Sequence, residues 1–203
     1  MSYCVKNLMT PEKSASVISL VFNPAVTAAF TFLILLYPPQ SNQTFLLLLA
    51  TCITFGTAVP LVMMYQLTKS GLISDFDVSN RQERTRPFIG AAASYFAGSG
   101  ALLLLRAPTI IITLMLCYAC NTIIMLGITF RWKISVHASG VAGPATALVY
   151  SMGAWAAVFF ILLIPVGWAR VQLKAHTPWQ VLAGALVTAI ATWLQLKIYF
   201  SFL

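Results

Sequence analysis

This chain has few acidic residues and little charge of either sign. Only four of its 203 residues are Asp or Glu, and 8% of all residues are charged. Soluble domains carry roughly a quarter charged residues. The hydrophobic share is 60% and the mean hydropathy is +0.88. The composition therefore excludes an ordinary soluble domain and predicts an all-α integral membrane protein.

Signs of a second domain and of a cleaved leader are also missing. No linker is long enough to divide the chain, so we expect one transmembrane domain over residues 1–203, with its motif-bearing core at about 68–203. Residues 1–16 are polar and lack the short apolar stretch and small-residue cleavage site of a secretory signal. The first apolar segment is therefore expected to be a retained helix.

Cysteine is scarce, and its placement does not favour a metal or redox site. The pair Cys117 and Cys120 lies inside a long apolar run, with no His or carboxylate nearby to complete a site. The favoured interpretation is that both are small apolar residues of a helix.

Long apolar segments are what the chain has in abundance. Two of the seven candidates, the fifth and the sixth, are shorter than the ~20 residues that a crossing usually needs. We therefore expect a bundle of six to seven transmembrane helices. The segments are 17–37, 44–67, 88–105, 109–130, 136–152, 154–168 and 178–200.

The few polar clusters are separated by even numbers of these segments. Two segments lie between the polar stretch 68–87 and the region of His137, and two more lie between His137 and His176. An even number of crossings returns the chain to the same membrane face. The sequence therefore predicts that three polar clusters meet at one interface.

The first cluster contains three arginines within six residues, Arg81, Arg84 and Arg86, followed by Pro87. Proline suits the first turn of the next helix, where its missing N–H has no partner to lose. Guanidinium groups are permanently charged and bind phosphate oxygens in a planar fork. The alternative is a basic loop that sets the topology under the positive-inside rule.

The second cluster, Lys133, Ser135 and His137, offers an ammonium, a hydroxyl and an imidazole beside a helix start. Backbone N–H groups at a helix start also favour anions. A passive polar anchor at the interface is the alternative for this histidine.

The third cluster joins Arg170, His176 and Gln180. Thr177 and Pro178 are typical of a helix start, so His176 is expected at the positive end of a helix dipole. Gln180 lies four residues after His176 and can hold one ring nitrogen while leaving the other free. The alternative is an interfacial histidine beside a tryptophan belt residue.

Together the clusters supply the groups that phosphoryl transfer without a metal needs. Cations stabilise the charge on the phosphoryl oxygens. One histidine can be the nucleophile, and the other can protonate the departing oxygen. The shortage of carboxylates argues against a two-metal site. No metal or other cofactor is therefore expected.

The motifs resemble the signature of the type 2 phosphatidic acid phosphatase superfamily, lipid phosphatases related to the vanadium haloperoxidases. That signature runs Lys-x6-Arg-Pro, then Pro-Ser-Gly-His, then Ser-Arg-x5-His-x3-Asp. The matching residues here are Arg86 and Pro87 in the first motif, Ser135 and His137 in the second, and Arg170 and His176 in the third. The resemblance covers about residues 75–184.

The resemblance implies a role for each matched residue. His176 would be the nucleophile and His137 the general acid, while Arg86, Arg170 and Ser135 would bind phosphate. Arg81, Arg84 and Lys133 are added to the phosphate-binding set from their position and charge, not from an exact match.

The chain also departs from the signature. Ser79 stands at the position of the first-motif lysine, Ile134 and Val136 replace the Pro and Gly of the second motif, and Ala169 replaces the Ser of the third. Gln180 replaces the Asp that orients the nucleophile, as in the similar dolichyl-diphosphate phosphatase branch. The resemblance thus implies a lipid phosphatase acting on a polyprenyl phosphate or diphosphate, or on the phosphatidate class.

Two other functions stay open. One is a catalytically weakened relative that binds or transports a lipid phosphate. The other is a magnesium-dependent prenyltransferase, suggested by Asp75 and Asp77. That chemistry normally needs a second acidic cluster, so these carboxylates are instead expected to cap a turn or to pair with arginines.

The expected partners are a lipid phosphate substrate and the bilayer, not nucleic acid, and the oligomeric state is left open. Most cations fall on the predicted site face, and only Arg106 and Lys197 fall opposite. The positive-inside rule then predicts a multi-pass protein of the cell membrane whose site faces the cytoplasm.

Overall fold

The computed structural model describes residues 10–37 and 41–202, and every regular element in these ranges is helical. Cys4, Lys6 and most of the polar N-terminal stretch lie outside the described residues. The α-helices are α1 (Pro11–Val21), α2 (Pro24–Leu36), α3 (Asn42–Ile53), α4 (Val59–Lys69), α5 (Thr85–Leu104), α6 (Thr109–Thr129), α7 (Val136–Met152), α8 (Leu163–Gln172) and α9 (Pro178–Tyr199). A π-helical segment, η1 (Thr54–Ala58), and two 3₁₀ segments, η2 (Arg81–Arg84) and η3 (Ala154–Leu162), complete them.

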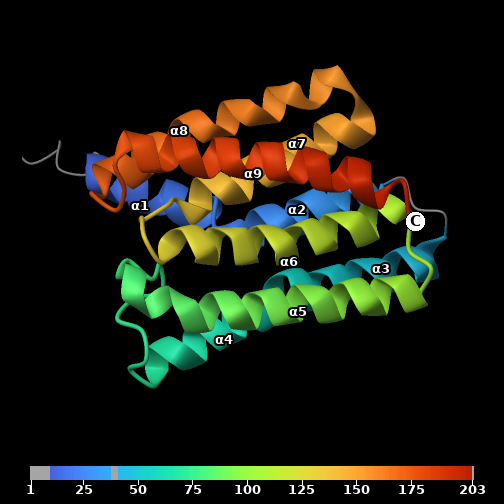
Figure 1. Cartoon of the computed structure of the whole chain (residues 1–203), viewed down its shortest axis with the longest axis horizontal. Helices are drawn as coiled ribbons and strands as arrows, with labels where there is room; N and C mark the ends of the chain where they lie inside the picture. The colour runs from blue at the N-terminus through green and yellow to red at the C-terminus, as the bar shows by residue number, and fades with distance from the viewer. Residues whose placement is uncertain (1–9, 38–40, 203) are drawn as a thin grey trace, which may run out of the picture.

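The helices run side by side along one long axis (Figure 1). Helices α7, α8 and α9 lie on one side, α3, α4 and α5 lie on the other, and α2 and α6 run between them (Figure 1). The chain reverses direction repeatedly, so α1 and the starts of α5, α7 and α9 share one end of the bundle. We refer to this end as the site end. The C-terminus lies at the opposite end (Figure 1).

The expected all-helical membrane bundle is confirmed, but with fewer clear spans than seven. Five helical runs are long and apolar enough to cross a membrane, and the bent pair α1–α2 makes a sixth if it counts as one span. Helix α7 is mostly buried, and with 17 residues it is shorter than a usual crossing. The five runs are Asn42–Lys69, Arg81–Leu104, Thr109–Thr129, Ala154–Gln172 and Pro178–Tyr199.

The first apolar segment is not the uninterrupted helix that the sequence suggested. It begins earlier, at Pro11, and bends by 48° between α1 and α2. Asn23 caps α2, because its Oδ1 accepts a hydrogen bond from Ala25 N at 3.0 Å, and Pro24 is the first residue of that helix. Proline cannot donate to the preceding turn, so a helix tends to stop and restart there.

The second apolar segment is continuous but carries a π-helical insertion. Segment η1 ends two residues before Pro60, inside the run Asn42–Lys69. A proline within a helix removes one backbone hydrogen bond and crowds the turn before it, and a π turn accommodates both effects.

Helix α7 forms the centre of the site end and packs against α9 and α2. Small residues make this close approach possible. A Cβ on Gly140 would lie 2.8 Å from Pro24 Cβ, and a Cβ on Gly184 would lie 2.4 Å from the carbonyl oxygen of Ser135. Backbones in such contact hold the starts of α2, α7 and α9 in fixed relation.

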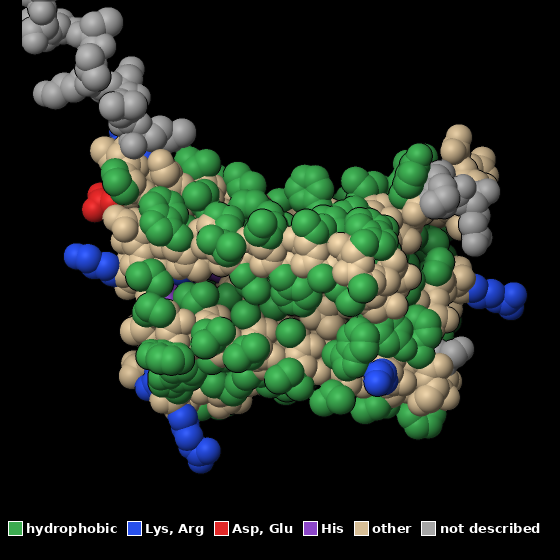
Figure 2. Space-filling view, turned by 90° about the horizontal axis from the view of Figure 1, so that it is seen from above, with side chains coloured by type: hydrophobic (Ala, Val, Ile, Leu, Met, Phe, Trp, Pro, Cys, Tyr) green, Lys and Arg blue, Asp and Glu red, His purple; other side chains and the backbone are tan. Residues whose placement is uncertain are grey.

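Hydrophobic side chains cover the long face of the molecule shown in Figure 2, while Lys and Arg side chains protrude at its two ends. Exposed apolar residues of the outer helices include Trp155, Ile161 and Ile164 on η3–α8, and Leu186 and Ile190 on α9. An apolar belt between charged ends fits a lipid bilayer environment.

Candidate active site

A large cavity opens at the site end and is lined by residues from all three polar clusters. Its volume is about 1210 Å³, open mouth included. Arg84 comes from the first cluster, His137 from the second, and Arg170 and His176 from the third, and all four line this cavity. The prediction from counting crossings, that these clusters meet at one end, is confirmed.

Arg170 is the most deeply buried charge of the site. It lies in the last turn of α8 and is 1% exposed. Its Nη1 donates to Ser19 Oγ at 2.6 Å and to Asp77 Oδ2 at 2.5 Å. Its Nε has no hydrogen-bond partner among the residues that the structure describes. A guanidinium so placed has donor capacity left for an anion.

Arg84 is 2% exposed and is anchored by backbone carbonyls, not by a carboxylate. Its Nε donates to the oxygen of Val78 at 3.0 Å, and its Nη1 donates to the oxygen of Ile134 at 2.9 Å. Neutral acceptors fix the guanidinium in place without cancelling its charge. Arg84 therefore contributes positive potential to the cavity.

His176 lies just before the N-cap of α9 and is held by that helix start. Its Nδ1 is 3.1 Å from Gln180 Oε1, and the same oxygen accepts from Thr177 N at 3.2 Å. Because a backbone N–H points at this atom, it is the amide oxygen, and Nδ1 must be the protonated nitrogen. The lone pair of His176 Nε2 is then free.

The surroundings keep the imidazole of His176 neutral. Burial, reinforced by the positive charges of Arg84 and Arg170, lowers the pKa of His176 to about 3, while the hydrogen bond to Gln180 acts in the opposite direction. An unprotonated ring is what a nucleophile needs.

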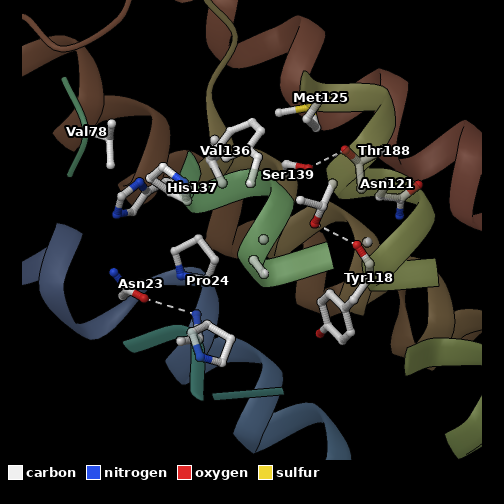
Figure 3. A pocket seen from close by; sticks show the side chains of 18 of the residues that line it. Asn23, Pro24, Val78, Tyr118, Asn121, Met125, Val136, His137, Ser139 and Thr188 are labelled. Atoms are coloured by element: carbon white, nitrogen blue, oxygen red, sulfur yellow. Dashed lines mark hydrogen bonds between the residues drawn. The ribbon is translucent and has the colours of Figure 1, made fainter. Parts of the chain in front are cut away.

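His137 lies in the first turn of α7 and is buried, and it is among the labelled residues that line the cavity in the close-up view (Figure 3). Its Nε2 is 3.3 Å from Ser19 Oγ and 3.9 Å from Asp77 Oδ1. Ser19 Oγ also accepts from Arg170. This serine therefore links the second and third clusters, and nothing in the sequence pattern singled it out.

Asp77 is the carboxylate that lines the cavity. Burial alone would raise its pKa, but the hydrogen bond and the charge of Arg170 outweigh burial and lower the pKa of Asp77. Asp75 instead accepts hydrogen bonds from Ser79 N at 3.1 and 3.2 Å. As expected for these two acids, Asp75 caps a turn and Asp77 pairs with an arginine.

The structure does not bring all of the predicted phosphate-binding residues into the cavity. Arg86, the residue that matches the family motif, is exposed and lies outside the cavity, and Arg81 donates to the oxygen of Phe130 at 3.3 Å. Arg84 takes the inward position because a 3₁₀ turn precedes α5 and directs it toward Val78 and Ile134. The arginine that lines the cavity is therefore Arg84, two positions before the motif residue Arg86.

Lys133 and Ser135 lie beside the cavity and do not line it. Lys133 is half-buried, and burial together with the charges of Arg84 and Arg170 lowers its pKa. Ser135 is buried and caps α7, accepting from Ala138 N at 3.4 Å. Its backbone N–H donates to the oxygen of Gln180 at 3.2 Å, which ties the starts of α7 and α9 together.

The cavity continues from the charged end into the bundle. Its lining extends from Arg84 at the end of η2 to Tyr95 on α5, a separation of eleven residues or about 16 Å at 1.5 Å per helical residue. Part of this inner lining is apolar. Another part carries paired polar groups, with Asn121 Nδ2 donating to Thr192 Oγ1 at 2.8 Å. A hydrogen bond also joins Ser139 to Thr188 (Figure 3). The apolar wall includes Met63, Met64, Phe88, Leu114 and Met125.

Comparisons with known protein-family models, with curated proteins and with solved structures found no match. Among the described residues, no three His, Cys, Asp or Glu side chains gather as ligands of a metal ion. Function must therefore be inferred from the chemistry of this cavity.

Proposed function

We propose that this protein is a membrane phosphatase that hydrolyses a phosphate or diphosphate ester of a lipid through a phosphohistidine on His176. One observation carries the proposal: one cavity joins two imidazoles and two buried guanidinium groups to an inner part with a largely apolar wall, whose lining spans about 16 Å of helix. Such a cavity is complementary to an amphiphile with an anionic head and an apolar tail. The resemblance to the type 2 phosphatidic acid phosphatase superfamily supports the same class.

Binding depends on Arg84 and Arg170. Their charges would hold the phosphoryl oxygens, and this stabilisation grows as the phosphorus becomes five-coordinate. These fixed cations can take the place that metal ions have in other phosphatases, so we expect turnover in EDTA. The tail would lie along the apolar wall of the cavity.

The first chemical step forms the covalent intermediate. Nε2 of His176 attacks the terminal phosphorus, and the bond from that phosphorus to the ester or bridging oxygen breaks. The protonated ring of His137 gives its proton to that oxygen, so a phosphate ester releases the lipid alcohol and a diphosphate ester releases the lipid monophosphate. The negative charge of a bound phosphate favours the protonated form of His137 that this step requires.

The second step restores the enzyme. Neutral His137 accepts a proton from a water molecule, whose oxygen attacks the phosphorus of phosphohistidine. The phosphorus–nitrogen bond breaks, inorganic phosphate forms and His176 returns to its neutral state. Gln180 fixes the ring throughout, but as an amide it stabilises the charged intermediate less than a carboxylate would.

A binding or transport protein without turnover is the second candidate. The amide of Gln180 and the engagement of Arg170 by Asp77 favour it, because each weakens one element of the catalytic scheme. Phosphate release separates the two functions.

The decisive assay measures inorganic phosphate released by the purified full-length protein in detergent with EDTA present. The substrates are phosphatidate, phosphatidylglycerophosphate, and polyprenyl phosphate and diphosphate. We expect release from at least one of them, with polyprenyl compounds preferred, and none from His176→Ala. Lys174→Ala is the matched control, because Lys174 is an exposed neighbour. Retained turnover in His176→Ala excludes the proposed nucleophile, and binding without release favours the second candidate.

We also propose that the site faces the cytoplasm, because the described cations concentrate at the site end, whereas Arg106 and Lys197 lie opposite. Labelling of Lys174→Cys by a membrane-impermeant thiol reagent tests this in cells. We expect labelling after lysis only, and labelling of intact cells would reverse the orientation.

A further inference from the structure

Asp77 lies where the phosphate group of a substrate would be expected. Its Oδ2 is 2.5 Å from Arg170 Nη1, and its Oδ1 is 3.9 Å from His137 Nε2. Arg170 and His137 are two of the side chains that the proposed reaction needs around phosphorus. The carboxylate therefore lies inside the proposed anion site.

Electrostatics explains why a carboxylate is there. A buried guanidinium without a counter-charge is strongly unfavourable. Among the described acidic residues, Asp77 is the one that lines the cavity. Carboxylates and phosphates accept hydrogen bonds from the same arrangement of guanidinium N–H groups. Asp77 and a phosphate therefore need the same donors and cannot both use them.

The backbone next to Asp77 is strained. Val78 has φ +47°, a conformation that a β-branched residue rarely adopts. Strain of this kind persists where surrounding contacts enforce it, and it concentrates at switch regions. Here the contacts are the ion pair of Asp77 with Arg170 and the hydrogen bond from Arg84 to the Val78 oxygen.

The rest of the loop is held on both sides of this point. Asp75 bonds to Ser79, and Glu83 Oε2 accepts from Ser74 N at 2.6 Å. The side chain of Asp77 itself is 35% exposed, whereas that of Arg170 is 1% exposed. A small movement of Asp77 toward solvent would therefore vacate the site without unfolding the loop.

We propose that Asp77 is an internal competitor that occupies the oxyanion site in the resting protein and is displaced by the phosphate group of the substrate. The inference rests on the proposed function for the identity of that substrate. It has two consequences. Asp77 weakens phosphate binding in proportion to the time it spends in the site. It also returns to Arg170 as inorganic phosphate leaves, which favours product release.

The test measures binding of inorganic phosphate and of orthovanadate to the purified full-length protein in detergent, by titration calorimetry at neutral pH. We expect Asp77→Asn to bind both anions about tenfold more tightly than wild type, because the competitor is removed. Asp77→Glu keeps the charge and should stay near wild type. Asp75→Asn removes the same charge from the same loop, and we expect a change within about threefold because that charge lies farther from the bound anion.

Equal or weaker anion binding by folded Asp77→Asn and Asp77→Ala would overturn the inference and make Asp77 a structural clamp for Arg170. Failure of both variants to fold would also overturn it, since a displaceable group must be dispensable for folding. An equal gain of anion affinity in Asp77→Asn and Asp75→Asn would show that the loss of one negative charge, not removal of a competitor, causes the effect, and would overturn the inference. This test measures no turnover, so it is independent of the proposed function. Tighter anion binding without lipid hydrolysis would support this inference and contradict the proposed function. Lipid hydrolysis without tighter anion binding would support the proposed function and contradict this inference.

Discussion

The two ends of the helical bundle both carry cations but hold them in opposite ways. At the end away from the site, Arg106 and Lys197 are exposed, and Lys197 Nζ lies 5.6 Å from the centre of the Trp193 ring. At the site end, Arg84 and Arg170 are buried inside a cavity. Exposed cations at a membrane interface are ordinary anchors. Buried cations are unfavourable unless an anion compensates them. The exposed pair therefore fits membrane anchoring, and the buried pair fits binding of an anion.

The largest expected effect compares a buried and an exposed arginine that lie two positions apart. Arg84 is buried in the cavity and Arg86 is exposed outside it. We expect Arg84→Gln to lower kcat/KM about 10²–10³-fold, as loss of one donor to a transition-state oxyanion does. Arg86→Gln should stay within about threefold, as an exposed charge would. Phosphate release with equal folded protein checks both. Equal losses would show that the linear motif, not the cavity, identifies the functional arginine.

The next largest effect concerns Gln180, which positions His176. Gln180→Leu should lower kcat about 10²-fold, because the proton is no longer held on Nδ1, while KM changes little. Gln180→Glu keeps the helix cap and adds a charge that favours the imidazolium. The pKa of His176 in the wild type is about 3. The added carboxylate raises that pKa. Activity of Gln180→Glu should therefore fall at a higher pH than wild type as the medium is acidified. Superimposable pH profiles would contradict this assignment.

The passage into the bundle can be tested by obstruction. Leu114 is buried on the cavity wall, whereas Ile124 on the same helix α6 is exposed at the outer surface. Leu114→Trp should lower kcat/KM for long-tailed substrates about tenfold while short-tailed ones change little, because a filled pocket excludes tail volume. Ile124→Trp should leave both unchanged. An equal loss on short and long tails would place the tail outside the cavity.

The smallest effect compares stability at the two ends. Gly184→Ala at the site end places a methyl group 2.4 Å from the oxygen of Ser135, whereas Gly100→Ala on α5 meets no atom within 4 Å. The first should destabilise by about 1–3 kcal/mol, and the second should stabilise by about 0.5–1 kcal/mol, since Ala favours the helix. Thermal unfolding in detergent measures both. A stable Gly184→Ala would mean that the contact between α7 and α9 relaxes easily.

The sequence predicted the membrane class, most helix bounds and the convergence of three polar clusters, because apolar length and the parity of crossings determine all of these. It also placed His176 and Gln180 together, since four-residue spacing on a helix brings side chains to one face. Asn23 and Pro24 signal the bend between α1 and α2, but the apolar content on both sides conceals it.

Other parts of the site could not be predicted, because they depend on contacts across the fold. The choice of Arg84 over Arg86 follows from a 3₁₀ turn and from carbonyls 6 and 50 residues away. Ser19 joins His137 and Arg170 across more than a hundred residues of sequence. The length and lining of the cavity arise from eight helical elements and the loops between them, and no local pattern encodes them.

The central claim is a covalent bond between phosphorus and His176, and trapping that bond tests it most directly. Wild-type protein keeps both steps, so brief incubation with ³²P-labelled lipid phosphate followed by a rapid alkaline quench should leave label on the protein. The bond should be acid-labile and base-stable, and His176→Gln should remove it. No label, or label that persists without His176, would contradict the account.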